Sequence, residues 1–355
     1  MKPDLKLSEL TTRAGEWLRG VGPHNEVVIS SRIRLARNLA GKPFLSRATR
    51  RQRTAVEKKI RDVVLSTNLA PKILYADLQE SPEVDRALLV ERHLISRNHA
   101  SAEGARGVAV DADETVSIMV NEEDHLRLQV LRSGLQLDDA WDQINEIDDD
   151  LDAALEFAFH PRFGYLTACP TNVGTGIRVS VMLHLPALKL TGDIEKVFRS
   201  AKELKLAVRG LYGEGTEATG EFYQVSNQTT LGKEEPEIIA EFRDTVIPKI
   251  VEYEHRARHA LISERHRALE DKVHRAVGLL RSARLVTSEE VLKELSYVRL
   301  GVNLEILAGV DVRTINELML MTQPAHLQKL LGKKLEGDDR RAARADFIRE
   351  RLGVI

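Results

Sequence analysis

The chain of 355 residues has a single cysteine, Cys169, so it cannot form a disulfide bond within itself, which fits a reducing cytoplasm. It also lacks an apolar run long enough to span a bilayer, and its first residues contain no apolar signal core. The net charge of −2 argues against general binding to nucleic acid or membrane surfaces, although local basic patches remain compatible with it. We therefore expect a soluble cytoplasmic protein that binds neither nucleic acid nor membrane.

Two common signatures of phosphate-handling enzymes are absent. The sequence has no Gly-x-x-x-x-Gly-Lys-Ser/Thr loop, and it has no His-Arg-Asp and Asp-Phe-Gly pair of motifs. The chain is therefore neither a P-loop enzyme nor a typical protein kinase.

The composition describes a soluble globular protein, with 43% hydrophobic and 30% charged residues. The length favours two domains. Strand-like runs and short helices alternate up to about residue 235, and helical patterns dominate from Pro236 onward. We place the domain boundary near residue 250, which gives a first domain over 1–250 and a helical domain over 251–355.

Several elements are clear from periodicity. Apolar residues recur at helical spacing over 49–66, 138–159 and 193–204. Residues 107–110 and 116–120 predict a β-hairpin, whereas residues 88–95 fit either a helix or a strand. In the C-terminal region, Thr287 and Glu290 form a capping box that opens a helix, and further helices are expected over 311–330 and 338–352.

An unusual acidic stretch, Asn-Glu-Glu-Asp-His-Leu-Arg at 121–127, directly follows the apolar run at 116–120. Acidic residues are depleted in strands because they pack poorly on a pleated surface. Three acids at the end of a strand suggest a carboxylate cluster at the rim of a sheet. The alternative, for an isolated triplet, is a solvated charged turn.

Arginines occur in similar settings elsewhere. In an extended backbone Arg32 and Arg34 point to the same side, since side chains alternate with a period of two. Two guanidinium groups on one side form a good clamp for a polyphosphate, although a pair of surface salt bridges is the alternative. Arg127, Arg178 and Arg209 also lie at strand ends, and a converging set of five would neutralise a triphosphate.

Glycine-rich segments adjoin these arginines. Gly174 and Gly176 permit positive φ angles and close approach to a ligand before Arg178. The segment 210–220 has too few apolar groups to pack on its own, and loops of this kind are often functional.

Taken together, these motifs resemble the phosphagen (guanidino) kinase superfamily. They occur in family order between residues 25 and 235: Val-Ile-Ser-Ser-Arg-Ile-Arg-Leu-Ala-Arg-Asn at 28–38, Asn-Glu-Glu-Asp-His-Leu-Arg at 121–127, Cys-Pro-Thr-Asn-Val-Gly-Thr-Gly-Ile-Arg at 169–178, Arg-Gly-Leu-Tyr-Gly-Glu at 209–214 and Val-Ser-Asn at 225–227. The resemblance implies an α+β fold. It comprises a catalytic domain with a mainly antiparallel β-sheet flanked by helices and an all-helical C-terminal domain.

The resemblance also implies an ATP site in which five arginines hold the phosphates and His93 lies at the adenine–ribose side. The implied set is Ser30, Ser31, Arg32, Ile33, Arg34, His93, Arg127, Arg178, Val179, Ser180, Val181, Met182, Arg209, Gly210, Leu211, Tyr212 and Gly213. Mg²⁺ would accompany ATP, and no protein side chain is expected to bind the metal.

On the acceptor side, the resemblance implies that Glu123 and Glu214 hold a guanidinium group, with Cys169 beside it. A guanidinium is protonated at physiological pH and its nitrogens are poor nucleophiles. A carboxylate can fix one nitrogen in line with the γ-phosphate and accept its proton. We hypothesise that Glu123 is the base and Glu214 its partner, with Asp124 and His125 as supports. For Cys169 the alternative is a small buried thiol at a strand end.

The layout resembles the bacterial protein-arginine kinases within this superfamily. The arginine motif begins almost at once, and the extra helical domain follows the catalytic domain, which leaves the acceptor side open to a protein. Met182 stands where small-substrate enzymes often have a histidine, and Thr230 where they carry another phosphate-binding arginine. The rival hypotheses are a kinase for free arginine or another small guanidine, and a non-catalytic adaptor that recognises phosphoarginine and delivers proteins to a protease.

A last motif lies near the C-terminus. Protein-arginine kinases carry Arg-Asp-x-x-Arg-Ala, which binds phosphoarginine allosterically, and the matching residues here are Arg340, Arg341, Arg344 and Ala345. Arg341 replaces the aspartate, so either a phosphoarginine pocket or a plain helix surface is expected. In a helix Arg340 and Arg344 share a face. The resemblance further implies a homodimer formed through the C-terminal domain, an activator protein, a protease–chaperone partner and a role in protein quality control.

Overall fold

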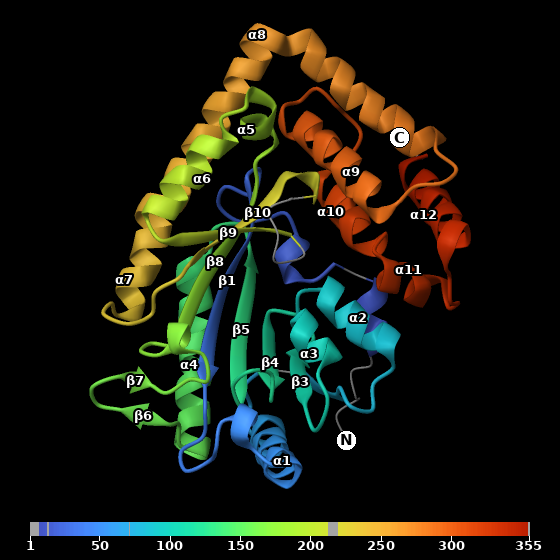
Figure 1. Ribbon diagram of the computed structural model, residues 1–355. Helices are drawn as coiled ribbons and strands as arrows, with labels where there is room; N and C mark the ends of the chain where they lie inside the picture. Colours follow the sequence, from blue (N-terminus) through green and yellow to red (C-terminus); the bar gives the residue numbers. More distant parts are fainter. Residues whose placement is uncertain (1–6, 13, 71, 212–218, 354–355) are drawn as a thin grey trace.

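The computed structural model describes residues 7–12, 14–70, 72–211 and 219–353 (Figure 1). Its central feature is an eight-stranded antiparallel sheet with the strand order β2-β3-β4-β5-β1-β8-β10-β9. The strands are β1 (Val28–Arg37), β2 (Ile73–Asp77), β3 (Gly107–Asp111), β4 (Val116–Val120), β5 (Leu126–Ser133), β8 (Ile177–His184), β9 (Leu206–Gly210) and β10 (Phe222–Asn227). A separate hairpin consists of β6 (Phe159–His160) and β7 (Gly164–Tyr165). The antiparallel sheet and its flanking helices confirm the predicted α+β class.

Helices flank the sheet and make up the C-terminal part of the chain. They are α1 (Arg50–Ser66), α2 (Glu83–Glu91), α3 (Arg97–Ser101), α4 (Leu137–Leu155), α5 (Pro186–Thr191), α6 (Ile194–Glu203), α7 (Glu235–Ala240), α8 (Ile247–Ser282), α9 (Ser288–Asn303), α10 (Val312–Met321), α11 (Pro324–Leu331) and α12 (Gly337–Leu352). A π-helical segment, Glu241–Val246, joins α7 to α8. Among the described residues, no helix combines the length and the apolar character that crossing a membrane requires.

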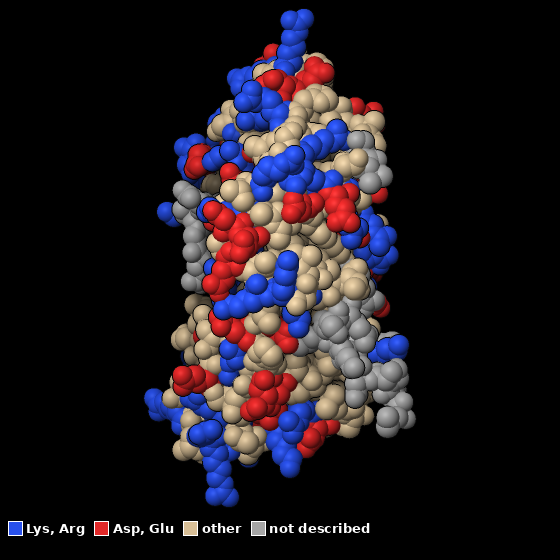
Figure 2. Space-filling view, turned by 90° about the vertical axis from the view of Figure 1, so that its right-hand side faces the viewer, with Lys and Arg blue, Asp and Glu red and all other residues tan. Residues whose placement is uncertain are grey.

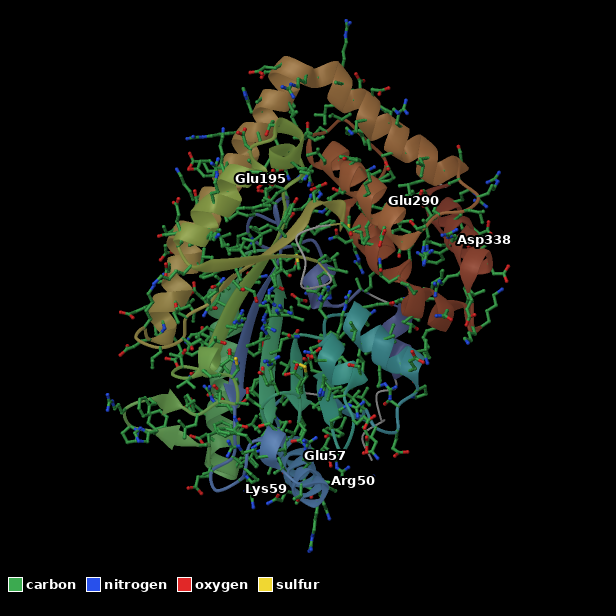
Figure 3. The ribbon with its side chains drawn as sticks, viewed as in Figure 1. Arg50, Glu57, Lys59, Glu195, Glu290 and Asp338 are labelled. Carbon is green, nitrogen blue, oxygen red and sulfur yellow. The ribbon has the colours of Figure 1, made fainter. Side chains whose placement is uncertain are left out.

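Most predicted elements are confirmed with small shifts at their ends. Helix α1 begins after Thr49, which forms a capping box with Gln52. Helix α4 ends at Leu155, four residues before the predicted limit. Residues 107–110 and 116–120 form the predicted hairpin of β3 and β4. Thr287 and Glu290 form the predicted capping box at the start of α9, where Figure 3 labels Glu290.

The two faces of the central sheet differ in chemistry. On β1, Ile33 and Leu35 are fully buried in the main core. Helix α4 packs on β1 and β5 to cover this apolar face, and α6 and α7 pack on β9 and β8 (Figure 1). Since alternate residues point to opposite faces, Arg32 and Arg34 are directed to the other side of the sheet.

Arg37 is the exception, because it is the one arginine of β1 that lies on the apolar face. Its Nε and Nη2 atoms donate to the carboxylate of Asp148 on α4 over 2.7–3.1 Å, and its Nη1 donates to the carbonyl groups of Ala36 and Thr175. Its guanidinium carbon lies 3.5 Å from the ring centroid of Tyr165. This buried ion pair ties α4 to the sheet beneath the polar face.

The C-terminal helices join the sheet through α8. This helix forms a continuous element across the predicted boundary near residue 250 and has a kink at Arg265, where φ is −133°. Helices α9 and α12 pack on α8 on the right of Figure 1. The division into residues 1–250 and 251–355 stays a prediction.

Buried arginines hold the helical region against the sheet region. Arg299 of α9 donates to the carbonyl groups of Asn25 and Glu26, at 2.6 and 3.0 Å. Arg92, at the end of α2, is buried in an ion pair with Glu114 and lies 2.7 Å from Nε2 of His326 on α11. The surface outside these contacts is of mixed sign, since Figure 2 shows basic and acidic side chains interspersed on one face.

We predict that Asp148→Asn lowers the free energy of unfolding by about 3–5 kcal/mol, because the Arg37 guanidinium then remains buried without its counter-charge. Denaturant unfolding at neutral pH measures this. Asp150→Asn, an exposed change on the same helix, is the matched control and should alter stability by less than about 0.5 kcal/mol. Equal stabilities of the two variants would contradict a structural role for the Arg37–Asp148 pair.

Candidate active site

The register of the sheet places all five predicted arginines on its polar face. Residues paired across an antiparallel ladder point to the same side. Arg34 pairs with Arg178, and Arg127 pairs with Ala36, two positions along β1. Arg209 pairs with Gln224, which is linked through Met182 to Ser30 on the same face. Four separate motifs therefore converge on one surface, as the sequence predicted.

The arginines form successive rows along β1. Arg127, paired with Ala36, lies at one end, next to the acidic loop 121–125. Arg34 and Arg178 form the next row, Arg32 and Ser180 the third, and Met182, Gln224 and Arg209 the fourth. Rows two residues apart are separated by roughly 6.5 Å along the strand. The positive charge thus extends over a length suited to a chain of phosphates.

Arg32 is held in place by polar neighbours. Its Nη2 donates to Gln224 Oε1 at 2.5 Å and its Nε donates to Ser180 Oγ at 3.4 Å. Burial, followed by the charges of Arg127, Arg178 and Arg209, lowers the pKa of Arg32 to about 10. Arg32 therefore remains a cation at neutral pH, and burial of its charge among like charges costs free energy.

Arg34 occupies the least favourable position for a charge. Burial and the charges of Arg32, Arg127 and Arg178 hold the pKa of Arg34 well below its ordinary value of 12.5. Its Nε atom is buried and has no hydrogen-bond partner among the described residues. A buried polar group without a partner costs free energy. Glu122 is the one acidic group that raises the pKa of Arg34, and it does not offset the lowering by burial and the neighbouring arginines, so a phosphate would supply further negative charge.

A cavity of about 400 Å³ adjoins the rows that contain Arg34, Arg32 and Arg209. It is lined by Arg32, Arg34, Val90, His93, Ile95, Ser96, Arg97, Asn98, Met119, Gln129, Arg209, Gly210, Leu211 and Gln224. His93 lies just beyond the end of α2 with a positive φ of 59°, and the Gln129 amide donates to its carbonyl group at 2.8 Å. Burial, aided by the charges of Arg32 and Arg97, lowers the pKa of His93 to about 3, so its ring is neutral.

The remaining residues of the predicted ATP set are divided between the two faces. Ser30, Ser180 and Met182 line a small cavity next to His93, and Gly210 and Leu211 line the larger one. By contrast, the side chains of Ile33, Val179 and Val181 are fully buried in the core on the opposite face. Ser31 is also buried, and its hydroxyl donates to the carbonyl of Gly134. Strand alternation explains this split, because the motif includes both faces of each strand.

The acidic loop lies at the end of the arginine rows where Arg127 is located. Glu123 is 45% exposed, and its Oε2 atom accepts from Arg127 Nη2 at 3.2 Å. Burial raises the pKa of Glu123 above its ordinary value of 4.5, and Asp124 and Glu122 add to this rise. Glu122 is held between two partners: it accepts from Ser96 Oγ at 2.6 Å and pairs with Arg127 at 2.9 Å.

Asp124 connects the acidic loop to the segment that carries Cys169. Its Oδ1 atom accepts from Asn38 Nδ2 and from the backbone N–H of Ala168, both at 2.6 Å. Asn38 in turn accepts from the backbone N–H of His125 at 3.0 Å. Buried side chains thus fix the loop beside Cys169. The predicted supporting role of Asp124 corresponds to these contacts.

Cys169 is partly exposed, and its Sγ lies 3.0 Å from Thr171 Oγ1. Burial lowers the pKa of Arg178, and the charges of Arg209 and Arg127 lower it further. Cys169 and Glu123 act on Arg178 in the opposite direction, so both lie near it. Thr230, where the superfamily pattern has an arginine, is buried and donates to the carbonyl groups of Thr171 and Val173. Tyr212, Gly213 and Glu214 lie outside the described residues.

Sequence reasoning missed several residues that complete the site. Gln129 and Gln224 lie on the arginine face, Asn38 organises the acidic loop and Arg97 lines the cavity. Polar residues at alternate positions in apolar strands were a usable signal for the two glutamines. Nothing in the sequence indicated Arg97, because its position beside the cavity depends on how the short helix α3 packs in the folded protein.

The C-terminal arginines lie apart from the sheet, on α12. Arg344 is buried and donates to the carbonyl groups of Thr322 and Val286, at 2.7 and 2.9 Å. Arg341 is exposed and pairs with Asp338, and Ala345 is buried in the helical core. Arg340 is partly exposed, and its charge and that of Arg344 act on Glu91 of α2.

Comparison with known proteins identifies the family. Residues 55–257 match the model of the ATP:guanido phosphotransferase C-terminal catalytic domain, and the chain belongs to this family. Residues 266–355 match a second model, the protein-arginine kinase McsB C-terminal domain. The resemblance seen in the sequence motifs is confirmed.

Relatives and solved structures agree with this assignment. The chain is 48% identical to the protein-arginine kinase of Halothermothrix orenii, covering 95% of this chain and 96% of that protein. It is 48% identical to the protein-arginine kinase of Symbiobacterium thermophilum, with 98% and 99% covered. Among solved structures, the duplicated taurocyamine kinase of Schistosoma mansoni matches 70% of this chain and 35% of that chain at 26% identity with a TM-score of 0.60. A lombricine kinase matches 71% of each chain at 26% identity with a TM-score of 0.59.

We predict that Arg34→Met stabilises the ligand-free protein by about 1–2 kcal/mol while abolishing its stabilisation by ATP. The change removes a charge that lies among like charges without a partner, and it also removes a phosphate ligand. Thermal and denaturant unfolding with and without ATP measure both effects. Arg37→Met, on the opposite face of the same strand, is the contrast and should destabilise the protein. A destabilised Arg34→Met variant would contradict the view that the arginine face is strained without a ligand.

Proposed function

We propose that this protein transfers the γ-phosphoryl group of ATP to the guanidinium group of arginine side chains in other proteins. The proposal depends on one observation: the successive rows that contain the five arginines end at the acidic loop carrying Glu123. A triphosphate along the arginines would present its last phosphate to an acceptor bound at the glutamate. Catalysis would then consist mainly of positioning and electrostatic stabilisation.

The proposed reaction proceeds by in-line attack. A guanidinium nitrogen of the acceptor forms a bond to the γ-phosphorus, the bond from that phosphorus to the β,γ-bridging oxygen breaks, and ADP leaves. The nitrogen loses its proton to the carboxylate of Glu123. Its raised pKa makes Glu123 a better proton acceptor than an ordinary glutamate. Arg127 and Arg178 hold the transferred group, since they lie nearest the acidic loop.

Two further acceptor residues belong to this proposal. Glu214 is the second carboxylate for the guanidinium, by its place in the family motif. Cys169 lies beside the acceptor, which is supported by its proximity to Arg178 and by the ties from Asp124 to Ala168. Orientation by two carboxylates accounts for most of the expected rate gain, since effective molarities can lower a barrier by roughly 7–11 kcal/mol.

Mg²⁺ is proposed to arrive bound to the phosphates of ATP. In the described part of the chain, no group of three or more His, Cys, Asp and Glu side chains is placed to hold a metal ion. The metal would then neutralise phosphate charge together with the arginines, and water would complete its coordination. Its chemistry is that of a Lewis acid on the transferring phosphoryl group.

Protein arginine is the proposed acceptor because the relatives with nearly full-length coverage are named protein-arginine kinases. A kinase for free arginine or another small guanidine, and a non-catalytic phosphoarginine adaptor, are the rival functions. The adaptor is disfavoured because a pure binding protein has no need of Glu123 beside five phosphate-binding arginines. Cytoplasmic location, a homodimer through the helical region, an activator, a protease–chaperone partner and a role in quality control are further parts of the proposal by family resemblance.

The helical region is proposed to bind phosphoarginine near Arg340. Arg341 does not fit this role, because it is exposed and pairs with Asp338. Arg340 and Arg344 instead act on Glu91, a carboxylate that can take the part of the missing aspartate toward a guanidinium group. The two arginines would bind the phosphate and Glu91 the guanidinium nitrogens.

We predict that Glu123→Gln lowers phosphorylation of a basic protein by at least about 100-fold, because orientation by the carboxylate and its function as base are both lost. Incubation with ATP, Mg²⁺ and the basic protein, followed by detection of acid-labile phosphate on arginine, measures this. Glu146→Gln, an exposed change on α4, is the control. Turnover of free arginine without protein labelling would instead establish a small-molecule kinase.

The pH profile tests the same assignment. Because the pKa of Glu123 is raised, kcat/KM should fall as the pH drops through a value above 4.5 and should be constant on the neutral side of it. The residual activity of Glu123→Gln should lack this acid limb. An unchanged limb in the variant would show that another group is the base.

For the phosphoarginine site, we predict that Arg340→Ala weakens binding of phosphoarginine at least about tenfold, since one charge-assisted contact is lost. Arg344 is a poorer probe because its guanidinium supports two backbone carbonyl groups. Calorimetry measures the change, with Arg313→Ala on α10, an exposed arginine paired with Glu317, as control. Equal affinities of Arg340→Ala and wild type would leave only a plain helix surface at this position.

A further inference from the structure

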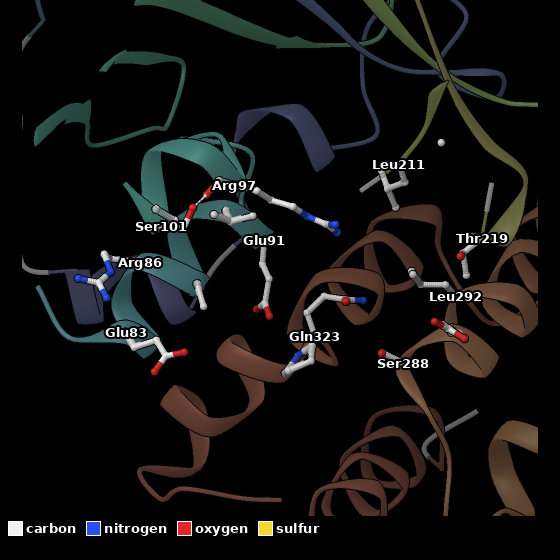
Figure 4. Close-up of a pocket in the computed structure, with 16 residues that line it drawn as sticks. Glu83, Arg86, Glu91, Arg97, Ser101, Leu211, Thr219, Ser288, Leu292 and Gln323 are labelled. Atoms are coloured by element: carbon white, nitrogen blue, oxygen red, sulfur yellow. Dashed lines mark hydrogen bonds between the residues drawn. The ribbon is translucent and has the colours of Figure 1, made fainter. Parts of the chain in front are cut away.

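A second cavity, of about 760 Å³, lies between the sheet region and the C-terminal helices. One wall comes from α2 and α3, and the other from α9 and the start of α11 (Figure 4). It shares Val90, Arg97, Gly210 and Leu211 with the cavity above the arginine rows. The two cavities therefore join, and Arg97 lies at their junction.

Arg97 brings a further guanidinium group to this region, from α3 and not from the sheet. No hydrogen bond or ion pair of that group occurs within the described residues. Figure 4 shows its side chain extending from α3 into the space toward Leu211. Arg86, which lines the same wall, donates instead to the carbonyl groups of Leu78 and Ser81, each at 3.2 Å.

The position of Arg97 is fixed by its neighbours. Ser96 caps α3 by accepting from the backbone N–H of His99 at 3.0 Å, and Ser96 itself donates to Glu122. Arg97 is close enough to His93 for its charge to act on the ring, as Arg32 does from the sheet side. Arg32, His93 and Arg97 thus line the same cavity, and both arginines bring positive charge to the histidine ring.

The acidic groups of the larger cavity do not neutralise Arg97. Glu91 accepts from the backbone N–H groups of Ala325 and His326, both at 2.8 Å, and thereby caps α11. Glu83 and Glu289 also line the cavity, and no ion pair of either with Arg97 is present in the described structure. A free cation beside a neutral histidine and the apolar Val90 and Leu211 fits a ligand with a planar base and an attached anion.

We propose that Arg97 is a sixth nucleotide-binding arginine, which binds the phosphate nearest the ribose at the nucleoside end of the site. This inference rests on the proposed function. Arg97 supplies its charge from α3, whereas the other five arginines belong to the sheet.

A contact at the nucleoside end has a characteristic kinetic effect. It is made equally in the ground state and in the transition state, because it is remote from the phosphorus that reacts. Arg97→Ala should therefore raise the KM for ATP and the Kd for ATP and ADP by about tenfold each, with kcat within twofold of wild type. Arg97→Lys should recover part of the loss, since it retains the charge without the planar fork.

Binding of ATP and ADP by calorimetry, together with steady-state kinetics, tests the proposal. Arg86→Ala is the matched control because it removes an arginine from the same cavity whose guanidinium is already engaged, and it should leave both Kd values unchanged. Unchanged nucleotide affinity in a folded Arg97→Ala variant would overturn the proposal. A loss with ATP and not with ADP would also overturn it, by placing the contact at the γ-phosphate.

The outcome for the wild-type protein separates this inference from the proposed function. Wild-type protein that binds ATP but phosphorylates no arginine would refute the proposed function, and the binding measurements would still decide the role of Arg97. Wild-type protein that binds no nucleotide would overturn both.

Discussion

The structure depends on holding five guanidinium groups within one face of a sheet although they repel one another. The pKa values of Arg32, Arg34 and Arg178 are lowered mainly by burial and further by the neighbouring arginines. Such an arrangement lowers stability, so it needs a rigid support that cannot relax outward. The support is the opposite face of the same strands, where apolar residues fill the core and the Arg37–Asp148 pair fixes α4. The repulsion among the arginines on one face and the tight apolar packing on the other both follow from the alternation of side chains along the strands.

The acidic loop is connected to this face by buried polar contacts instead of by apolar packing. Asp124 reaches Asn38 and Ala168, and Glu122 reaches Arg127 and Ser96. The first set connects the loop to the segment with Cys169, and the second connects it to α3 above the nucleotide cavity. Hydrogen bonds fix direction more sharply than apolar contacts do. One seven-residue stretch, 121–127, therefore makes both sets of contacts, and it also carries Glu123.

The sequence was informative about individual strands and much less so about their pairing. Period-two alternation correctly placed Arg32 and Arg34 on one side, but the convergence of Arg178 and Arg209 with them depends on the strand order, which was available only through the family motifs. For the same reason, a motif that runs through β1 and β8 included Ile33, Val179 and Val181, whose side chains lie in the core. The segment around His93 stayed ambiguous because α2 ends inside it and the histidine adopts a positive φ. Arg97 could not be predicted from the sequence, since its proposed role depends on the packing of α3 beside a cavity.

Three consecutive residues join the helical region to the cavity beside the arginine rows. Glu91 caps α11, Arg92 contacts His326 of the same helix, and His93 lines the nucleotide cavity. Glu91 and Arg92 therefore connect α11 directly to the segment that carries His93. Arg344 and Arg340 of α12 also act on Glu91 through their charges, so α11 and α12 both adjoin this one segment of chain.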